Sequence, residues 1–475
     1  MKKLLHSIIA ITALCNVACS TSNMETTPIK YTAQTNPYLA PAGSASMHAD
    51  GHSSDATPAK GPGATEWDIQ FFNLEGTCPT VMVGTDGFIL TMNTSPTREF
   101  PPRVLLLDPE TGEVLSKISV AQGSLLGGTY AYMDHKNRVV LVDGNSQLLR
   151  IAHSNDGTKL FIDEQTDLSE FMKQVEGDAA TSLMPDFKGR VWIGTGKARV
   201  AMVDENGKVH GIDLGSKEET IDNSISTAPE GVGVTTSHAM YLLNVDENGA
   251  PKILWRKAYD RGSHRKPGQL SWGTGASPTF FGPNGSDFVM LTDNADRQEN
   301  LIIHRTKDGE ILHTTGIFEP GASGTECSMI GAGNMVIGES TYGYPYPAYP
   351  ESAGKSVPEN APFAPGLARW DITPSGLQLK WKKDIYSATV PRLACGDGIV
   401  YLYERKPEKD GKLGKVLQAM AVDAATGEIL HAQSIPGDID GQGLDPIQMV
   451  GVITEDGVWW QGTLMGMLRI KAKKK

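Results

Sequence analysis

The sequence predicts an all-β fold, an eight-bladed β-propeller, and three observations support this prediction. A strand-rich unit recurs about every 45–60 residues from residue 78 onward. Glycine and proline are plentiful, 52 and 28 residues, as a chain with many tight turns requires. The turn text Leu107-Asp108-Pro109-Glu110-Thr111-Gly112-Glu113 returns as Val422-Asp423-Ala424-Ala425-Thr426-Gly427-Glu428, and more weakly as Val203-Asp204-Glu205-Asn206-Gly207. Because one such unit cannot bury both of its faces alone, a closed ring of units is expected.

Each blade is expected to begin with a short first strand, followed by a turn and a strongly apolar second strand. Eight starts predict eight blades; seven blades is the alternative, because the fourth start is weakly marked. The alternating segment 67–72 is predicted to complete the last sheet, and the proline-rich segment 343–366 is predicted to be a long surface loop. The starts fall at Cys78, Gly128, Thr181, Asn223, Ser277, Glu326, Val390 and Asp445.

The overall charge argues against a nucleic-acid partner. The 475 residues include 43 Lys and Arg against 55 Asp and Glu, a net charge of −12. A protein that binds DNA or RNA through its phosphates needs a basic surface. Hydrophobic residues make up 39% of the chain, which is enough for a buried core.

The N-terminus has the features of a targeting segment. Lys2 and Lys3 precede an apolar stretch from Leu4 to Ala13 that is too short to span a bilayer. Asn16-Val17-Ala18-Cys19 resembles a bacterial lipoprotein cleavage box, which implies a signal peptide over 1–18 and acylation, including palmitate, at Cys19. Ser20 in place of Asp implies retention in the outer membrane, facing the periplasm or the surface. A plain secretory signal is the alternative.

Between the signal and the repeats, residues 19–65 are rich in Ser, Thr, Ala, Pro and Gly and are predicted to be a flexible tether. The propeller is then expected over 66–475. Of the cysteines in it, Cys78, Cys327 and Cys395, at most one pair can form a disulfide.

The Leu-Asp-x-x-Thr-Gly-Glu turn and the eight-fold count resemble the quinoprotein-type propellers. That superfamily includes dehydrogenases that use pyrroloquinoline quinone (PQQ) and a scaffold lipoprotein of outer-membrane assembly. More narrowly, four segments resemble a group of secreted bacterial propeller proteins to which we attach no activity. These segments are Met47-His48-Ala49-Asp50, Tyr132-Met133-Asp134, Gly273-Thr274-Gly275-Ala276-Ser277-Pro278-Thr279 and Thr292-Asp293-Asn294-Ala295-Asp296. The chain lacks the adjacent Cys-Cys pair of the quinone enzymes and a Cys-x-x-Cys-His haem motif, which disfavours PQQ as the cofactor.

Propeller geometry predicts where polar residues converge. The first strand of a blade crosses the ring and the second returns, so first-strand starts and second-strand ends share one face around the axis. We expect an axial mouth there, with Glu326, Asp293 and His264 as acid–base candidates, because clustered buried carboxyls raise one another's pKa. The alternative is that such residues satisfy turn amides. The expected ligand-binding residues are Arg265, Lys266, Asn294, Asn223, Glu339 and Tyr342.

Two segments are candidates for a divalent metal. In an extended chain His48, Asp50 and His52 point to the same side, with Asp55 nearby, and such a set suits Zn²⁺. The oxygen-rich segment 292–297 suits Ca²⁺, although a capped turn is the favoured interpretation there.

We therefore expect an exported, lipid-anchored propeller that binds a small organic or carbohydrate (glycan) substrate at its axial mouth. If it is an enzyme, lyase or hydrolase chemistry fits these residues better than redox chemistry. The rival expectation is a non-enzymatic envelope scaffold that holds protein partners through loops such as 343–366; a PQQ-dependent dehydrogenase is the less favoured alternative.

Overall fold

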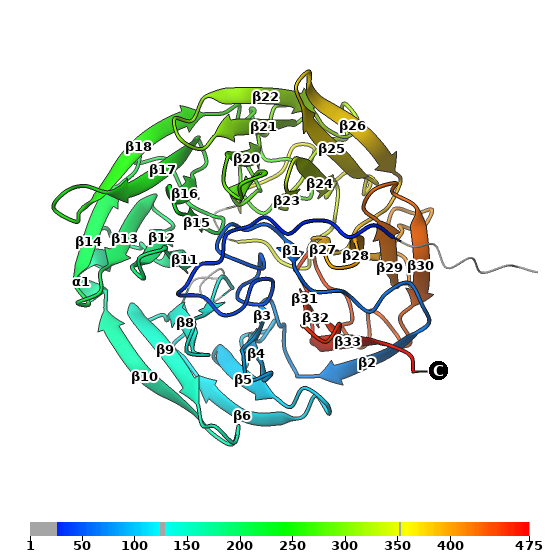
Figure 1. The fold of residues 1–475 in the computed structure, drawn as a ribbon, viewed down its shortest axis with the longest axis horizontal. Helices are drawn as coiled ribbons and strands as arrows, with labels where there is room; N and C mark the ends of the chain where they lie inside the picture. The colour runs from blue at the N-terminus through cyan, green and yellow to red at the C-terminus, as the bar shows by residue number, and fades with distance from the viewer. Residues whose placement is uncertain (1–25, 124–128, 351–352, 475) are drawn as a thin grey trace, which may run out of the picture.

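Eight small β-sheets stand in a ring around one axis in the computed structural model, which confirms the predicted eight-bladed propeller (Figure 1). The structure describes residues 26–123, 129–350 and 353–474. The signal peptide and Cys19 lie outside these residues. The one helix in the described part, α1 (Ser169–Met172), is short, and no described helix is long and apolar enough to cross a bilayer.

We number the blades along the chain, and in each the first strand lies nearest the axis. Blades 1 to 4 are β3 (Val81–Val83), β4 (Ile89–Asn93), β5 (Arg103–Leu107) and β6 (Val114–Ser119); β7 (Tyr132–Met133), β8 (Val139–Val142), β9 (Gln147–His153) and β10 (Leu160–Asp167); β11 (Ala180–Pro185), β12 (Val191–Thr195), β13 (Arg199–Val203) and β14 (Val209–Asp213); and β15 (Ser226–Ala228), β16 (Gly231–Thr235), β17 (Ala239–Val245) and β18 (Pro251–Ala258).

The second half of the ring repeats this order and is closed by the start of the domain. Blades 5 to 8 are β19 (Thr279–Phe281), β20 (Phe288–Thr292), β21 (Asn300–Arg305) and β22 (Ile311–Gly316); β23 (Ile330–Ala332), β24 (Met335–Glu339), β25 (Leu367–Thr373) and β26 (Gly376–Lys383); β27 (Arg392–Ala394), β28 (Ile399–Glu404), β29 (Gln418–Asp423) and β30 (Ile429–Ser434); and β31 (Val452–Ile453), β32 (Trp459–Thr463), β33 (Gly466–Ala472) and β2 (Trp67–Asn73).

Blade 8 closes the ring, because its outermost strand comes from the other end of the domain. β2 pairs antiparallel with β33 along its whole length, as the alternating segment 67–72 predicted. No strand is assigned to the described residues of 343–366, which confirms a long loop between β24 and β25.

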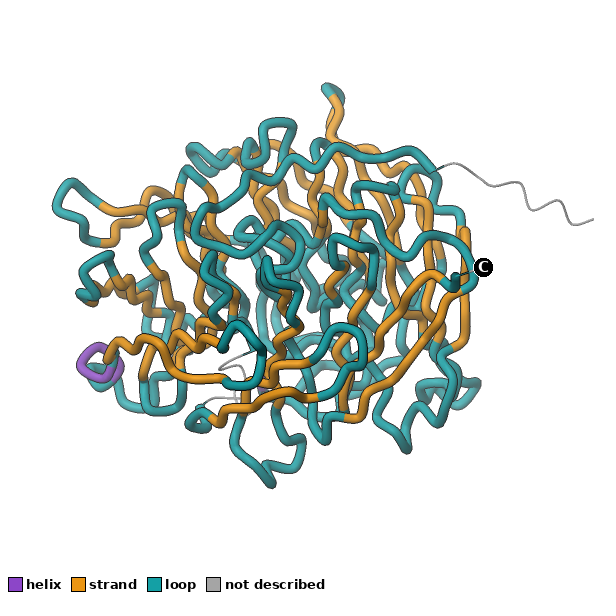
Figure 2. The backbone as a smooth tube through the Cα atoms, turned by 60° about the horizontal axis from the view of Figure 1, so that its bottom comes forward, coloured by secondary structure: helices purple, strands orange, loops and turns teal. Residues whose placement is uncertain are grey.

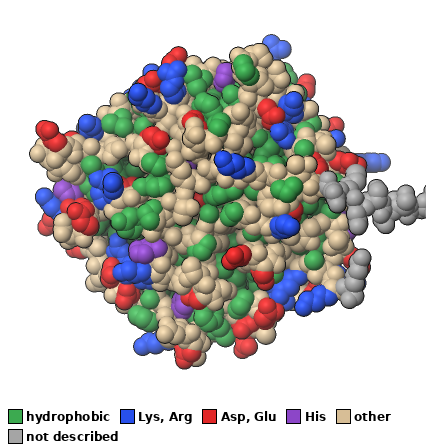
Figure 3. Space-filling model, in the orientation of Figure 1, with side chains coloured by type: hydrophobic (Ala, Val, Ile, Leu, Met, Phe, Trp, Pro, Cys, Tyr) green, Lys and Arg blue, Asp and Glu red, His purple; other side chains and the backbone are tan. Residues whose placement is uncertain are grey.

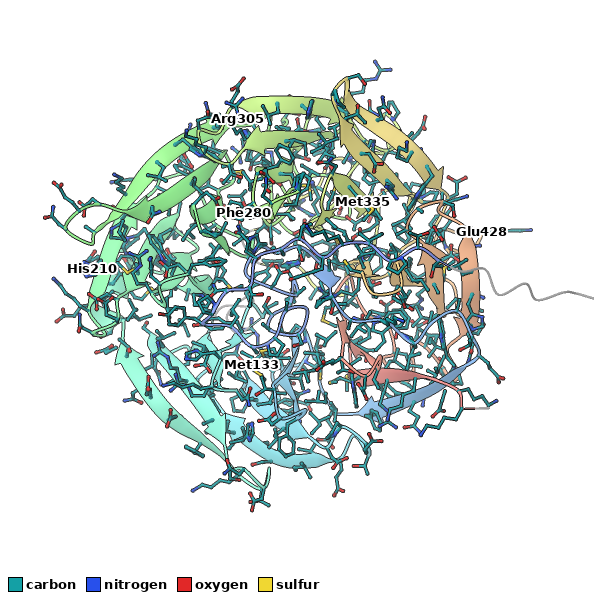
Figure 4. The ribbon with its side chains drawn as sticks, in the orientation of Figure 1. Met133, His210, Phe280, Arg305, Met335 and Glu428 are labelled. Atoms are coloured by element: carbon teal, nitrogen blue, oxygen red, sulfur yellow. The ribbon has the colours of Figure 1, made fainter. Side chains whose placement is uncertain are left out.

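The burial of each strand follows its distance from the axis. Second strands such as β12 are buried along their whole length, whereas the outermost strand β14 alternates between covered and exposed residues. Figure 4 shows the same gradient: Met133 and Phe280 lie near the axis, and Arg305 and Glu428 lie at the rim. A sheet with both faces covered needs continuous apolar sequence, and a sheet edge facing water does not.

The repeated turn text is explained by one carboxylate. Asp108 Oδ1 accepts the backbone N–H of Glu110 at 2.9 Å and of Thr111 at 2.7 Å. Asp423 Oδ1 does the same for Ala425 at 2.7 Å and Thr426 at 2.8 Å. Gly112 and Gly427 both have φ of 71°, a conformation that a side chain disfavours. The motif therefore encodes a turn, not a ligand site.

The ring has two faces, and Figure 2 shows it obliquely, with loops joining the strands at both faces. We call the face where the first strands begin the mouth face, and the face of the turns between first and second strands the turn face. Thr77, ahead of β3, forms a bridge with Thr94, just after β4. First-strand starts and second-strand ends therefore share the mouth face, as the sequence predicted.

The segment expected to be a tether is instead part of the folded body. Residues 26–43 cross the turn face, drawn in dark blue in Figure 1, and residues 44–57, which we call the plug, enter the axis. Figure 3 shows no open hole through the centre of the turn face. The plug ends in β1 (Ala56–Thr57), which lies parallel to β27.

Backbone hydrogen bonds to six blades hold the plug. Its carbonyls accept N–H groups of the first strands, so each blade satisfies one polar group of the plug. The plug is polar and glycine-rich, yet it is buried, because its hydrogen-bond partners lie far away in the sequence. The bonds run from Val83 to Ser44 (3.0 Å), Met133 to Ala45 (2.7 Å), Thr227 to Gly51 (2.5 Å), Phe280 to His52 (2.9 Å), Gly331 to Ser54 (3.1 Å) and Leu393 to Asp55 (3.0 Å).

Candidate functional site

The tip of the plug forms the floor of the mouth face at the axis. Met47 packs against Cys327, Val390 and Val450, which all precede first strands. The next residue, His48, is therefore held at the level where the first strands begin. The plug fills the axis on the turn-face side of His48, and His48 is itself buried, 6% exposed.

His48 is oriented by a carboxylate from its own segment. Its Nδ1 lies 3.1 Å from both carboxylate oxygens of Asp55. Ser328 Oγ lies 2.9 Å from the same Nδ1 and donates to Asp55 Oδ2 at 2.7 Å. A carboxylate facing Nδ1 favours the tautomer with the proton on Nδ1, which leaves Nε2 as a base.

The free ring nitrogen of His48 faces a serine. Ser277 Oγ lies 3.4 Å from His48 Nε2. Ser277 Oγ also accepts the hydroxyl of Ser224 at 2.7 Å and its backbone N–H at 3.2 Å. With both acceptor positions used, the Ser277 hydroxyl proton is directed to Nε2. Asp55, His48 and Ser277 thus have the connectivity of an acid–histidine–serine triad, whose nucleophile–base contact is commonly loose without substrate.

The negative charge of Asp55 is also compensated by a buried arginine, Arg392. Arg392 Nη1 lies 3.8 Å from Asp55 Oδ1, and both side chains are buried, 1% and 0% exposed. The Arg392 guanidinium donates to the carbonyl of Met47 at 3.0 Å and to that of Gly451 at 2.7 and 2.9 Å. A buried carboxylate is retained only with such partners.

Tyrosines and carboxyls surround the floor. The Tyr130 ring is stacked on His48, with centroids 6.3 Å apart and planes at 24°. Glu326 Oε2 accepts the backbone N–H of Leu270 at 2.8 Å, and burial raises the pKa of Glu326 well above its usual value. Burial also raises the pKa of Asp222, despite the Thr220 hydroxyl that donates to it at 2.7 Å. The Tyr346 hydroxyl is buried and has no hydrogen-bond partner among the described residues.

Glu326 and Asp222 therefore keep a proton at pH values where ordinary carboxyl groups are already ionised. A protonated Glu326 can donate a proton or a hydrogen bond to a ligand, and the buried Tyr346 hydroxyl has capacity for one more partner. Beside Cys327 a third carboxyl, Glu339, is fully buried, and burial raises its pKa to about 8.

Of the three predicted acid–base residues, the structure brings only Glu326 to this mouth. Asp293 accepts the backbone N–H of Ala295 and of Asn300, at 3.2 and 2.7 Å, which is the turn-capping alternative. His264 lies farther out, with Nδ1 2.8 Å from Ser263 Oγ. For Asp293 the reason is radial, because it follows the second strand β20 and neighbouring strands lie about 4.8 Å apart; His264 lies in the connection between β18 and β19.

The predicted ligand-binding residues have structural partners. Arg265 donates to the carbonyl of Gly354, at 2.9 and 3.2 Å, and so attaches the loop 343–366. Lys266 Nζ donates to the carbonyl of Ala295 at 2.6 Å and lies 3.8 Å from the buried Glu299. The rest are placed as follows: Asn294 donates to Arg261 and His264 carbonyls, Asn223 donates to Thr274 and Ala276 carbonyls, Glu339 lies beside Cys327, and the Tyr342 ring packs near Gly324.

The residues expected to bind a metal do not converge. Asp50 accepts the hydroxyls of Tyr31 and Ser54, at 2.6 and 2.5 Å, and the His52 ring lies edge-on to Phe280 at 6.1 Å, away from His48. Among the described residues, no group of three or more His, Cys, Asp or Glu side chains is arranged to hold a metal ion. The three cysteines Cys78, Cys327 and Cys395 are buried as free thiols.

Sequence reasoning grouped His48 with Asp50 and His52, with Asp55 nearby, as a metal site, and it did not single out Tyr130, Asp222 or Ser328. The one usable signal was the place of Ser277 and Glu326 at first-strand starts. The seven-residue spacing of His48 and Asp55 has no periodic meaning, since the plug reverses direction between them.

The comparisons with known proteins show no family for this chain. No family model and no curated protein matches the chain. Similar solved structures include a streptogramin B lyase (TM-score 0.42, 10% identity, 85% of this chain and 97% of that one) and virginiamycin B lyase from Staphylococcus aureus (0.40, 13%, 71% and 96%). A dihydro-haem d1 dehydrogenase is also similar (0.42, 11%, 77% and 71%). Likeness at this level says nothing about activity.

Proposed function

We propose that the protein binds a small organic or carbohydrate substrate at the axial mouth and transforms it by acid–base chemistry, with hydrolysis favoured over elimination. The single observation that carries this proposal is the buried Asp55–His48–Ser277 arrangement at the floor of the mouth. Neutral or hydroxyl-rich substrates suit the site, because carboxyls and tyrosines make up its wall and the nearby Arg265 and Lys266 are occupied.

In the hydrolytic reaction, Ser277 Oγ attacks the acyl carbon of an ester or lactone while His48 Nε2 takes the hydroxyl proton. The bond to the leaving group breaks and His48 returns the proton to the leaving oxygen. Water then attacks the acyl-serine by the same proton route and releases the acid. Asp55 stays ionised and stabilises the imidazolium, and Glu326, in its protonated form, donates a hydrogen bond to the substrate.

The test is covalent labelling with a fluorophosphonate, a probe that reacts with serines activated by a histidine. The full-length protein is expected to be labelled at Ser277, identified by peptide mass spectrometry. Labelling should be lost in Ser277→Ala and His48→Asn. Ser328→Ala is the matched control, because Ser328 contacts His48 Nδ1 rather than Nε2 and should remain compatible with labelling of Ser277.

The outcome also separates hydrolysis from elimination. A label absent from Ser277, or retained in His48→Asn, contradicts the serine mechanism. If a substrate is found whose turnover survives Ser277→Ala and fails in His48→Asn, His48 acts as the base of a lyase instead. Candidate esters, lactones and oligosaccharides can be screened by the rise in unfolding temperature that a bound ligand causes.

A second candidate function, an envelope scaffold, is favoured by the filled axis. The plug closes the channel, and the loop 343–366 carries exposed Tyr349 and Val357, 42% and 52% accessible. In this case His48→Asn with Glu326→Gln would leave the cellular role intact, and replacing residues 345–350 by a Gly-Ser linker would abolish it. The opposite pattern supports the enzyme.

We also propose that Cys19 is acylated and anchors the protein in the outer membrane. The support is the sequence around Asn16-Val17-Ala18-Cys19, which resembles a lipoprotein cleavage box. Cells fed radioactive palmitate are expected to label the wild type and not Cys19→Ala. Cys395→Ala is the control, since that buried thiol should accept no lipid. Equal labelling of wild type and Cys19→Ala contradicts the proposal.

A further inference from the structure

A cavity of about 620 Å³ opens on the turn face, on the opposite side of the plug from His48. It lies between blades 1 and 8 and both ends of the plug. Its volume falls within the range of small-molecule sites, roughly 300–1,000 Å³. Pro109 and Glu110 at its edge belong to the repeated turn, and none of its residues takes part in the proposed axial chemistry.

The walls of this cavity are largely apolar. Aliphatic and proline side chains come from the plug ends and from blades 1 and 8, among them Pro41, Pro58, Ile89 and Val458, and the Trp460 ring also lines the cavity. Trp460 is held from behind by Phe72, with ring centroids 5.7 Å apart and planes at 27°. Trp460 is itself almost completely buried, 1% exposed, so it contributes to the base of the wall rather than to a broad open surface.

Negative charge is concentrated at the rim. The lining includes three carboxylates, of Glu110, Glu455 and Asp456, and one ammonium group, of Lys471. Lys471 Nζ lies 2.9 Å from Glu110 Oε2, so that pair is internally neutral. Among the described residues no Lys, Arg or His forms an ion pair with Glu455 or Asp456.

We propose that this cavity is a second ligand site, for a small amphipathic amine. The apolar body of the ligand packs on the wall that includes Trp460, and its ammonium group lies beside Glu455 and Asp456, where it supplies the missing positive charge. The site is independent of the acid–base chemistry proposed at the mouth and does not rest on it.

The cavity also connects the two ends of the plug. Ser44 and Ala42 line it from the segment that enters the axis, and Thr57 and Ala59 from the segment that leaves it. A ligand that contacts both ends binds only the form with the plug in place. An amine bound here therefore stabilises the plugged form over any form in which either end has lifted away.

The experiment compares tryptamine with tryptophol, which has the same indole ring and a neutral hydroxyl in place of the amine. Binding to the full-length protein is measured by calorimetry at low salt and by the shift in unfolding temperature. We expect tryptamine to bind about three- to tenfold more tightly, since two solvent-exposed carboxylates contribute modestly to affinity, and we expect this preference to shrink as salt is added.

Two sets of variants locate the site. The double variant Glu455→Gln/Asp456→Asn should lose the preference for tryptamine, whereas Glu247→Gln, in an exposed turn of blade 4, should keep it. Thr85→Trp, on the exposed rim of the cavity, should weaken both ligands by filling the space. If Thr85→Trp unfolds at a lower temperature than the wild type, Ala59→Phe replaces it as the filling variant. Glu326→Gln at the axial mouth should change neither affinity.

Three results at the cavity itself overturn the proposal. They are equal affinity for the two ligands, a tryptamine preference that survives in the Glu455→Gln/Asp456→Asn variant, and undiminished binding when the cavity is filled. Loss of tryptamine binding in Glu326→Gln assigns the amine to the axial mouth and contradicts the second site.

Discussion

His48 and Asp55 are seven residues apart in the plug, and the His48 Nδ1 atom lies 3.1 Å from both carboxylate oxygens of Asp55. The pair is buried at the axis, in a segment that no repeat predicts. Its other partners, Ser277 and Ser328, come from blades 5 and 6. A base and its orienting group are thus supplied by one end of the chain, and the hydroxyls they face are supplied by the ring.

Replacing Asp55 by Asn should reduce fluorophosphonate labelling of Ser277 by about 10²–10⁴-fold, because an amide no longer favours the Nδ1–H tautomer or the imidazolium of His48. The rate of labelling, followed by mass spectrometry, measures this. Asp50→Asn is the matched control: it is the same change in the same plug, at a carboxylate that Tyr31 and Ser54 contact and His48 does not. Comparable loss in both variants would assign the effect to disruption of the plug.

The plug should be sensitive to side-chain volume at Gly43. Its φ is 88°, and a Cβ there would lie 2.9 Å from Thr57 Cα. Gly63, with φ of 74°, has open space in the same direction. Gly63→Ala should therefore cost about 1 kcal/mol of unfolding free energy from backbone strain, and Gly43→Ala about 1–3 kcal/mol more. Urea unfolding measures the loss of stability in both variants. Equal losses would show that the close approach to Thr57 does not affect stability.

Stability should fall with rising pH through the titration of Glu339. Burial raises its pKa from 4.5 to about 8, so the folded state holds a proton that the unfolded state releases. The stabilisation is complete below about pH 4.5 and is lost as pH rises toward 8, by at most about 1.4 kcal/mol per pH unit. Glu339→Gln should flatten this slope, measured by urea unfolding at several pH values. Glu113→Gln, at an exposed position, should not change it.

Lys266 should act on stability rather than on substrate binding. Lys266→Met removes the ammonium group beside the buried Glu299, whose pKa burial raises to about 8, and should cost about 1–3 kcal/mol of unfolding free energy, while Lys266→Met/Glu299→Gln, which also removes the carboxylate charge, should recover part of that loss. Ligand affinity at the mouth should be unchanged in the folded double variant. A loss of affinity with normal stability would return Lys266 to the ligand-binding role that the sequence suggested.

What the sequence determined by itself is local. The Asp-x-x-Thr-Gly-Glu turn, in which Asp108 and Asp423 each accept two backbone amides, and the buried second strands depend on residues within a few positions of one another. Repetition of that local unit was enough to predict eight blades, ring closure by β2, and the shared face of first-strand starts and second-strand ends.

What only the tertiary structure decided is radial position and the course of the plug. Asp293 and Glu326 lie on the same face of the ring. Asp293 caps the turn after a second strand, whereas Glu326 borders the axis. The sequence pattern predicts the face on which a residue lies but not its distance from the axis. The plug has no period, since its carbonyls accept bonds from first strands up to 338 residues away, as Asp55 does from Leu393. Contacts of that separation are set by closure of the ring, and so the Asp55–His48–Ser277 arrangement exists only once all eight blades and the N-terminal segment have come together.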